Sequence, residues 1–134
     1  MDSIGVMMSR VWGESADLSK YIGKRIRSAE IKGEQELRII FDDGTGIMLT
    51  DDGQSCCERR YMHTDDDLNS IAGHELRRIE LKDGPTKEDA YGDSHEQQFL
   101  EIGTDQGFVT IVNHNEHNGY YGGFAIKLAE IEGE

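Results

Sequence analysis

The chain has 134 residues, of which 36% are hydrophobic and 31% are charged, and its formal net charge is −13. That length suffices for one domain with a sizeable core, and the apolar content is too high for a disordered chain. The acidic balance argues against direct binding to nucleic-acid backbones or anionic membranes. It favours a soluble protein, a cation ligand or a basic partner.

Targeting signals are not evident in the sequence. No apolar run approaches the length needed to span a bilayer, and residues 1–8 lack the basic start and long apolar core of a secretory signal. Two cysteines suit a reducing compartment better than a disulfide framework. We therefore expect a cytoplasmic protein that does not associate with membranes.

In chain order, residues 1–16 carry little pattern and are expected to form a flexible arm. Residues 17–23 then predict a helical turn that ends at a glycine in the left-handed conformation. The next three segments predict strands, with a hairpin turn at 42–45 between the second and the third. These strands are expected over residues 24–32, 37–41 and 47–49.

The segment from residue 67 repeats the segment from residue 17 at a constant offset (67 − 17 = 50). Six of the 16 positions in 17–32 are identical to their counterparts in 67–82, where about one is expected by chance. In both copies the apolar residues are spaced by three and then by two, as in Ile26, Ala29 and Ile31. Strict alternation would give only steps of two, so a β-bulge is predicted at the same place in each copy.

Beyond the hairpin, Gly44 matches Gly107 at a larger offset (107 − 44 = 63), which indicates 13 inserted residues (63 − 50) within 83–98. A single domain, 1–134, therefore contains a first repeat over 17–64 and a second over 67–132. One repeat cannot bury its own apolar face. We predict a mainly β fold, an antiparallel sandwich or a partly open barrel built by internal duplication, with one or two short helices.

The two most polar stretches, residues 51–58 and 113–123, fall at equivalent places in the two repeats. The second offset aligns Asp51 with His114 (114 − 51 = 63). We expect both stretches to be loops that emerge side by side and line one pocket.

Cys56 and Cys57 are candidate nucleophiles. Adjacent cysteines in an extended segment point to opposite faces, so only one can serve a given site. In the catalytic interpretation, one cysteine acts as a thiolate nucleophile beside His63, His114 or His117. The alternative is that one sulfur is simply buried in the core.

His114, His117 and Cys57 are the candidate metal ligands, and zinc is the metal that such nitrogen and sulfur donors favour. Their spacing matches no zinc motif, so no cofactor is expected. The alternative is a hydrogen-bonded turn with its histidines at the surface.

Tyr120 and Tyr121 lie among three glycines, which let a ligand approach the backbone closely. Tyrosine rings suit stacking on a base or a sugar, and Arg59 or Arg60 would meet an anionic group. The predicted ligand-binding residues are Arg59, Arg60, Asn113, His114, Asn115, Glu116, His117, Asn118, Tyr120 and Tyr121.

Two stretches resemble a family of small uncharacterised proteins of bacteriophages and bacteria. They are the DGQSCCERRY stretch at residues 52–61 and the NHNEHNGYYGG stretch at residues 113–123. The resemblance covers about residues 18–128 and implies no established activity. It implies a phage or bacterial cytoplasmic setting, and small phage proteins of this kind often antagonise host defence.

Together these features predict a non-enzymatic module that binds a small polar, nucleotide-like ligand and so sequesters a signal. One alternative is a metal-dependent or thiol hydrolase built on Cys56 or Cys57. The other is an acidic inhibitor that binds a basic protein partner. An exposed strand edge also favours a homodimer.

Overall fold

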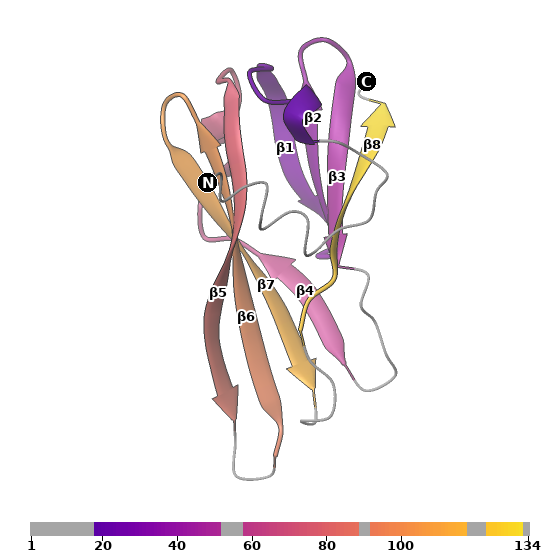
Figure 1. The fold of residues 1–134 in the computed structure, drawn as a ribbon, viewed down its shortest axis with the longest axis vertical. Helices are drawn as coiled ribbons and strands as arrows, with labels where there is room; N and C mark the ends of the chain where they lie inside the picture. Colours follow the sequence, from indigo (N-terminus) through magenta and orange to yellow (C-terminus); the bar gives the residue numbers. More distant parts are fainter. Residues whose placement is uncertain (1–17, 52–57, 89–91, 118–122, 133–134) are drawn as a thin grey trace.

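The computed structural model describes residues 18–51, 58–88, 92–117 and 123–132. These residues form two four-stranded antiparallel sheets, ordered β1-β2-β3-β8 and β4-β7-β6-β5 (Figure 1). The prediction of a mainly β, antiparallel sandwich with short helices is confirmed. The elements are η1 (Leu18–Lys20), β1 (Ile26–Lys32), β2 (Glu36–Phe41), β3 (Thr45–Asp51), β4 (Arg59–His63), η2 (Leu68–Ile71), β5 (Leu76–Glu88), β6 (Ser94–Thr104), β7 (Phe108–His117) and β8 (Ile126–Glu132).

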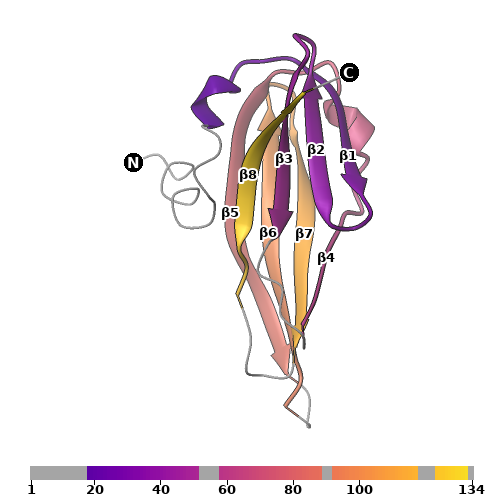
Figure 2. The ribbon, with the colours of Figure 1, turned by 90° about the vertical axis from the view of Figure 1, so that its right-hand side faces the viewer.

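The two sheets pack face to face and enclose the core between them (Figure 2). Alternate residues of each strand point inward, as in β2, where Leu37, Ile39 and Phe41 are fully buried. The second sheet contributes inward residues of the same kind, such as Leu100 and Ile102. Each fully buried side chain of this type contributes about 1.5–3 kcal/mol relative to exposure. The alternating apolar pattern of the strands therefore fixes which face of each sheet is inside.

The helices are single 3-10 turns that precede β1 and β5. Each is followed by a glycine in the left-handed region, Gly23 at φ 93° and Gly73 at φ 86°. A residue without Cβ adopts this conformation at little cost, so the chain can turn sharply into the next strand. No helix in the described part of the chain is long and apolar enough to cross a membrane.

A β-bulge lies at corresponding places in β1 and β5. The pairing register shifts between Ile26 and Ser28 in β1, and between Leu76 and Arg78 in β5. These positions differ by the predicted offset (76 − 26 = 50), so the spacing of the apolar residues located the irregularity correctly. The internal duplication itself stays an interpretation of the sequence.

The fourth strand of each sheet comes from the other half of the chain. β4 follows β3 in sequence but pairs with β7, with Tyr61 opposite His114. β8 follows β7 but pairs with β3, with Leu128 opposite Leu49. Each sheet therefore contains three consecutive strands of one half and the last strand of the other half.

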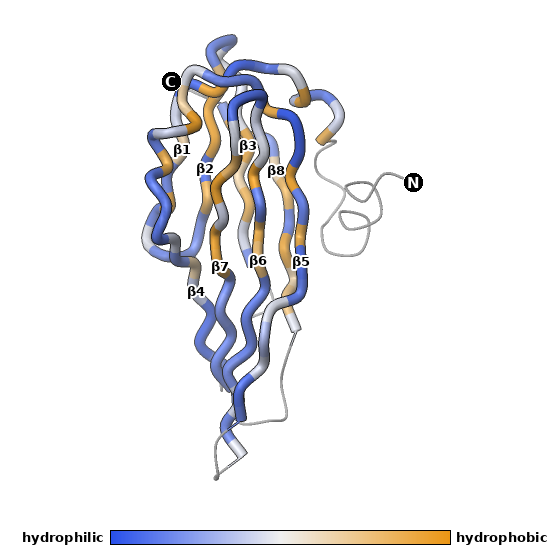
Figure 3. The backbone as a smooth tube through the Cα atoms, turned by 90° about the vertical axis from the view of Figure 1, so that its left-hand side faces the viewer, coloured by the Kyte–Doolittle hydropathy of each residue, from blue (hydrophilic) through white to orange (hydrophobic). Residues whose placement is uncertain are grey.

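The second sheet extends beyond the end of the first (Figure 1). The extension consists of the ends of β5 and β6, within the predicted insertion at 83–98, together with the end of β7 and β4. It is hydrophilic, in contrast to the apolar strands of the sandwich (Figure 3). The candidate site residues lie in this polar extension.

Candidate functional site

The candidate residues 113–117 form the end of strand β7, so the expectation that they lie in a loop is wrong. They are held between β4 and the extended end of β6, with Asn115 opposite both Arg60 and Glu96. Successive strand residues point to opposite faces. The inner face carries Asn113, Asn115 and His117, and the outer face carries His114 and Glu116.

The inner face is built around the buried guanidinium of Arg60, which is 6% exposed. Its Nη1 donates to Asp51 Oδ1 at 2.7 Å, and its Nη2 donates to Glu58 Oε2 at 2.7 Å. The predicted role of Arg60, binding an anionic ligand group, is not supported by this arrangement. Two carboxylates already neutralise the cation, and their attraction is strong because all three groups are shielded from water.

The two polar stretches meet at their described ends. Asn115 Nδ2 donates to Glu58 Oε2 at 3.0 Å and to the carbonyl oxygen of Gly123 at 3.0 Å. Arg60 also donates to that carbonyl, at 3.2 Å. Residues 51, 58, 115 and 123 therefore belong to one hydrogen-bond network, as expected if the stretches emerge side by side.

His117 belongs to the same inner face. Its Nε2 lies 2.8 Å from Glu96 Oε1, which also accepts a hydrogen bond from the Gly123 backbone at 2.9 Å. Glu96 thus connects the end of β7 to the segment that leads into β8. His117 is nearly buried, whereas the alternative of a hydrogen-bonded turn places it at the surface.

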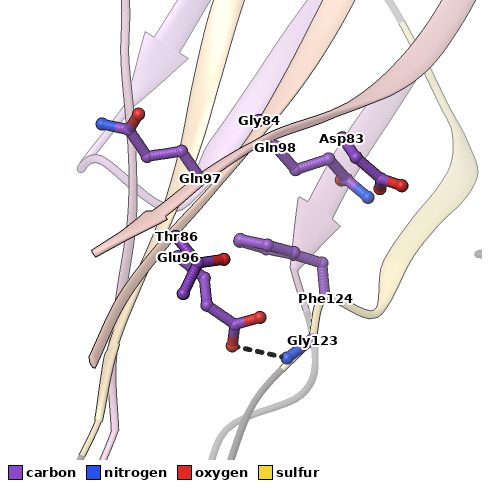
Figure 4. Close-up of a pocket in the computed structure, with 8 residues that line it drawn as sticks. All are labelled: Asp83, Gly84, Thr86, Glu96, Gln97, Gln98, Gly123 and Phe124. Carbon is purple, nitrogen blue, oxygen red and sulfur yellow. Dashed lines mark hydrogen bonds between the residues drawn. The ribbon is translucent and has the colours of Figure 1, made fainter. Parts of the chain in front are cut away.

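Beside this network lies a cleft of about 540 Å³ (Figure 4). One wall comes from the extended β5–β6 hairpin and the other from residues 123–124, with the ring of Phe124 pointing inward. Gln98, on the β6 wall, accepts a hydrogen bond from the buried amide of Asn113 at 3.3 Å. The lining residues are Asp83, Gly84, Thr86, Glu96, Gln97, Gln98, Gly123 and Phe124.

Polar atoms behind the cleft keep unused hydrogen-bonding capacity. Among the described residues, Asn113 Oδ1, Asn115 Oδ1 and Arg60 Nε are buried and have no hydrogen-bond partner. Buried polar atoms in folded proteins are nearly always paired. All three atoms belong to the inner face of the polar extension.

The outer face carries a second cluster, centred on His114. The Tyr61 ring stacks on the His114 ring with centroids 4.4 Å apart and an interplanar angle of 7°. His95 Nε2, on β6, lies 2.8 Å from His114 Nδ1. The Tyr61 hydroxyl donates to Glu116 Oε2 at 2.6 Å, and the Arg59 guanidinium lies over the Tyr61 ring.

Burial and charge shift two pKa values in this outer cluster. Burial, together with the hydrogen bond to Glu116 and its charge, raises the pKa of Tyr61 to about 12, so the phenol keeps its proton at neutral pH. Burial, followed by the nearby charges of His95 and His63, lowers the pKa of His114. Both groups are therefore neutral at pH 7 and act through hydrogen bonds and stacking.

The predicted metal ligands are not brought together. His114 and His117 point to opposite faces of the same strand because they are three positions apart, an odd number, and Cys57 lies outside the described residues. Within the four described ranges, no group of three His, Cys, Asp or Glu side chains could hold a metal ion as it stands.

Several predictions fall on residues that the structure does not describe. They concern Cys56, Cys57, Asn118, Tyr120, Tyr121 and the arm over residues 1–16. The thiol chemistry and the stacking by Tyr120 and Tyr121 stay predictions for that reason.

Five residues of the two clusters were not predicted from the sequence: Tyr61, His95, Glu96, Gln98 and Phe124. Three of them lie on β6 within or beside the insertion, whose pairing with β7 has no local sequence signal. Tyr61 follows the candidate Arg60, and Phe124 follows the predicted stretch at 113–123. Their proximity to the predicted stretches was the only available indication.

These features define a mainly β protein, a two-sheet sandwich with a polar extension that carries a cleft. Residues 19–126 match the model of the family described as domain of unknown function DUF7448, and the chain belongs to that family. No curated protein and no solved structure matches the chain.

Proposed function

We propose that the protein is a non-enzymatic module that binds a small ligand in the cleft between the β5–β6 extension and Phe124. The observation that carries this proposal is a cleft of about 540 Å³ beside buried amide oxygens that lack partners among the described residues. Small-molecule sites have this size and combine an apolar surface with a few placed polar groups. Phe124 supplies the flat apolar surface, and Gln98 and Glu96 supply the acceptors.

The charges around the cleft indicate the chemistry of the ligand. Asp83 and Glu96 line it, and its described lining residues include no lysine or arginine. The nearest buried cation, Arg60, is paired with two carboxylates. The cleft therefore suits a planar group rich in N–H donors, such as a nucleobase, and disfavours a phosphate group. A nucleotide would bind by its base, with its phosphates directed toward solvent.

The setting follows from the resemblance described above. A phage-encoded protein in a bacterial cytoplasm that holds a nucleotide-like signal would lower the free concentration of that signal. Sequestration requires affinity but no reaction, in agreement with a cleft that contains hydrogen-bond acceptors and an aromatic ring. We propose this role for the protein.

Isothermal titration calorimetry against nucleosides, nucleotides and cyclic nucleotides tests the proposal. We expect one ligand per chain, and binding about tenfold weaker in Phe124→Ala because loss of a stacked ring costs about 1–3 kcal/mol. Phe108→Ala is the matched control, since Phe108 is 58% exposed on the outer face at the opposite end of β7. Absence of binding to every member of the panel would discard the nucleotide version.

A further inference from the structure

The outer cluster lies on the opposite face of the second sheet from the proposed ligand cleft. His95, His114 and Glu116 belong to neighbouring strands, and the register places His95 directly opposite Glu116 and Gln97 opposite His114. The three side chains therefore share one face. The side chains of His95 and Glu116 are 34% and 41% exposed, so a solute can reach them, whereas His114 is 8% exposed and lies beneath them.

From this arrangement we infer that His95 Nε2 and His114 Nδ1 bind one divalent transition-metal ion, with the Glu116 carboxylate as the third ligand. Imidazole and carboxylate donors suit zinc, nickel and copper better than magnesium or calcium. Two histidines and one glutamate are also a ligand set used by zinc sites that keep an open position. Water would complete the coordination.

The distances are close to those that a metal ion requires. Metal–ligand bonds of about 2.0–2.2 Å at tetrahedral angles place neighbouring donor atoms roughly 3.3–3.6 Å apart. His95 Nε2 lies 2.8 Å from His114 Nδ1 and 3.9 Å from Glu116 Oε2. Binding of one ion therefore requires the two imidazole nitrogens to separate slightly and the Glu116 carboxylate to approach His95.

Two hydrogen bonds hold the set in its metal-free arrangement. The ring nitrogens of His95 and His114 share a proton, and the Tyr61 hydroxyl holds Glu116. On binding, the shared proton moves to the outer nitrogen of its own imidazole, so that each neutral ring keeps one proton and both facing nitrogens coordinate. Binding also requires the Glu116 carboxylate to leave Tyr61, because no three-ligand group is formed among the described residues.

The surroundings favour metal binding by the imidazoles and disfavour it at the Glu116 carboxylate. Stacking on Tyr61 fixes the His114 ring. Arg59 Nη1, 3.8 Å from Glu116 Oε2, disfavours a cation there. The net charge of −13 attracts cations to the molecule as a whole.

Calorimetric titration of untagged full-length protein with zinc and with nickel tests the inference, with magnesium as the contrasting ion. We expect one zinc or nickel ion per chain and no magnesium binding. His95→Gln and His114→Gln should each weaken binding by about 100-fold, whereas His74→Gln, at the opposite end of the sheet beside Asp105, should leave it unchanged. Circular dichroism establishes that each variant is folded.

Tyr61→Phe separates this site from adventitious binding. It keeps the ring stacked on His114 but releases Glu116, so it should bind zinc more tightly, and Glu116→Gln should bind it more weakly. Failure of the folded wild-type protein to bind zinc or nickel saturably would overturn the inference. Equal affinity of His95→Gln and wild type would also overturn it, as would weaker zinc binding by Tyr61→Phe.

Discussion

Arg59 and Arg60 are neighbours in sequence and have opposite roles. Arg60 is buried between Asp51 and Glu58, whereas the Arg59 side chain is 62% exposed and lies 3.8 Å from Glu116. Alternation along β4 separates them, since one residue points inward and the next outward. The sequence offers two equivalent arginines, and the sheet makes only one of them structural.

Replacement of Arg60 should therefore destabilise the fold strongly. Arg60→Met removes the cation that two buried carboxylates share, and breaking such a pair costs about 3–5 kcal/mol. Arg59→Met should cost less than about 1 kcal/mol, as for other exposed pairs. Urea denaturation of the two variants measures the difference. Similar midpoints would contradict the structural role of Arg60.

A second expectation at the residue scale concerns pH. The pKa of His114 is lowered in the folded protein, so the unfolded chain takes up a proton first as the pH falls. Neutral His114 therefore contributes fully to the free energy of unfolding above about pH 6.5, the ordinary pKa of histidine. This contribution is lost as the pH falls from about 6.5 toward the lower pKa of His114 in the folded protein.

The free energy of unfolding, measured by urea denaturation at pH 7.5, 6.5 and 5.5, checks this. Wild type should lose stability over this interval, and His114→Gln should lose less of it. If His114→Gln lost more stability than wild type over this interval, the lowered pKa of His114 would not account for the pH dependence. His74→Gln serves as a comparison because His74 is part-exposed and far from the cluster.

At the scale of elements, the first three strands were predictable because apolar alternation and a glycine turn mark them locally. The end of β7 was not. Asn113, Asn115 and His117 carry the polar side chains of a loop, yet they point inward and are buried. Their partners come from two other parts of the chain: Glu58 precedes β4, and Glu96 and Gln98 lie on β6. No local pattern shows that these polar segments will meet.

The same limit applied to the candidate site. Spacing alone grouped His114 with His117, because they are close in sequence. Strand geometry instead groups His114 with His95, across a register that the insertion determines. The duplication did indicate that the two polar stretches would meet, since equivalent ends of equivalent strands lie near each other in a sandwich.

The irregularity in β5 should be essential to the extension. The register shifts between Asp83 and Thr86, and a Cβ at Gly84 would lie 2.8 Å from the backbone oxygen of Gln97. Gly84→Ala must displace one of the two strands, at a cost of about 1–3 kcal/mol. Thermal unfolding with Thr86→Ala as control measures this, and an unchanged midpoint in Gly84→Ala would contradict it.

At the scale of the whole molecule, the exchange of fourth strands joins the two halves. β4 pairs with β7 over five residue pairs, and β8 pairs with β3 over seven. Neither sheet is complete without residues from both halves, and the core lies between the sheets. The halves should therefore be unable to unfold separately.

We accordingly expect one cooperative unfolding transition. Far-ultraviolet circular dichroism and intrinsic fluorescence should give coincident urea curves, as two-state behaviour requires. The separate fragments 17–64 and 65–134 should each lack a cooperative transition. Two resolved transitions in the full chain, or a stable fragment, would contradict this dependence.

The position of β8 also bears on the order in which the protein can acquire its structure during synthesis. β3 emerges from the ribosome early, but the strand that covers its edge, Ile126–Glu132, is made about 80 residues later. Until then the nascent chain presents an unpaired apolar strand edge, the kind of surface that invites mispairing. Pairing between strands that are so far apart in the sequence is slow. Chaperone assistance would therefore be of most use to this chain between the synthesis of β3 and that of β8.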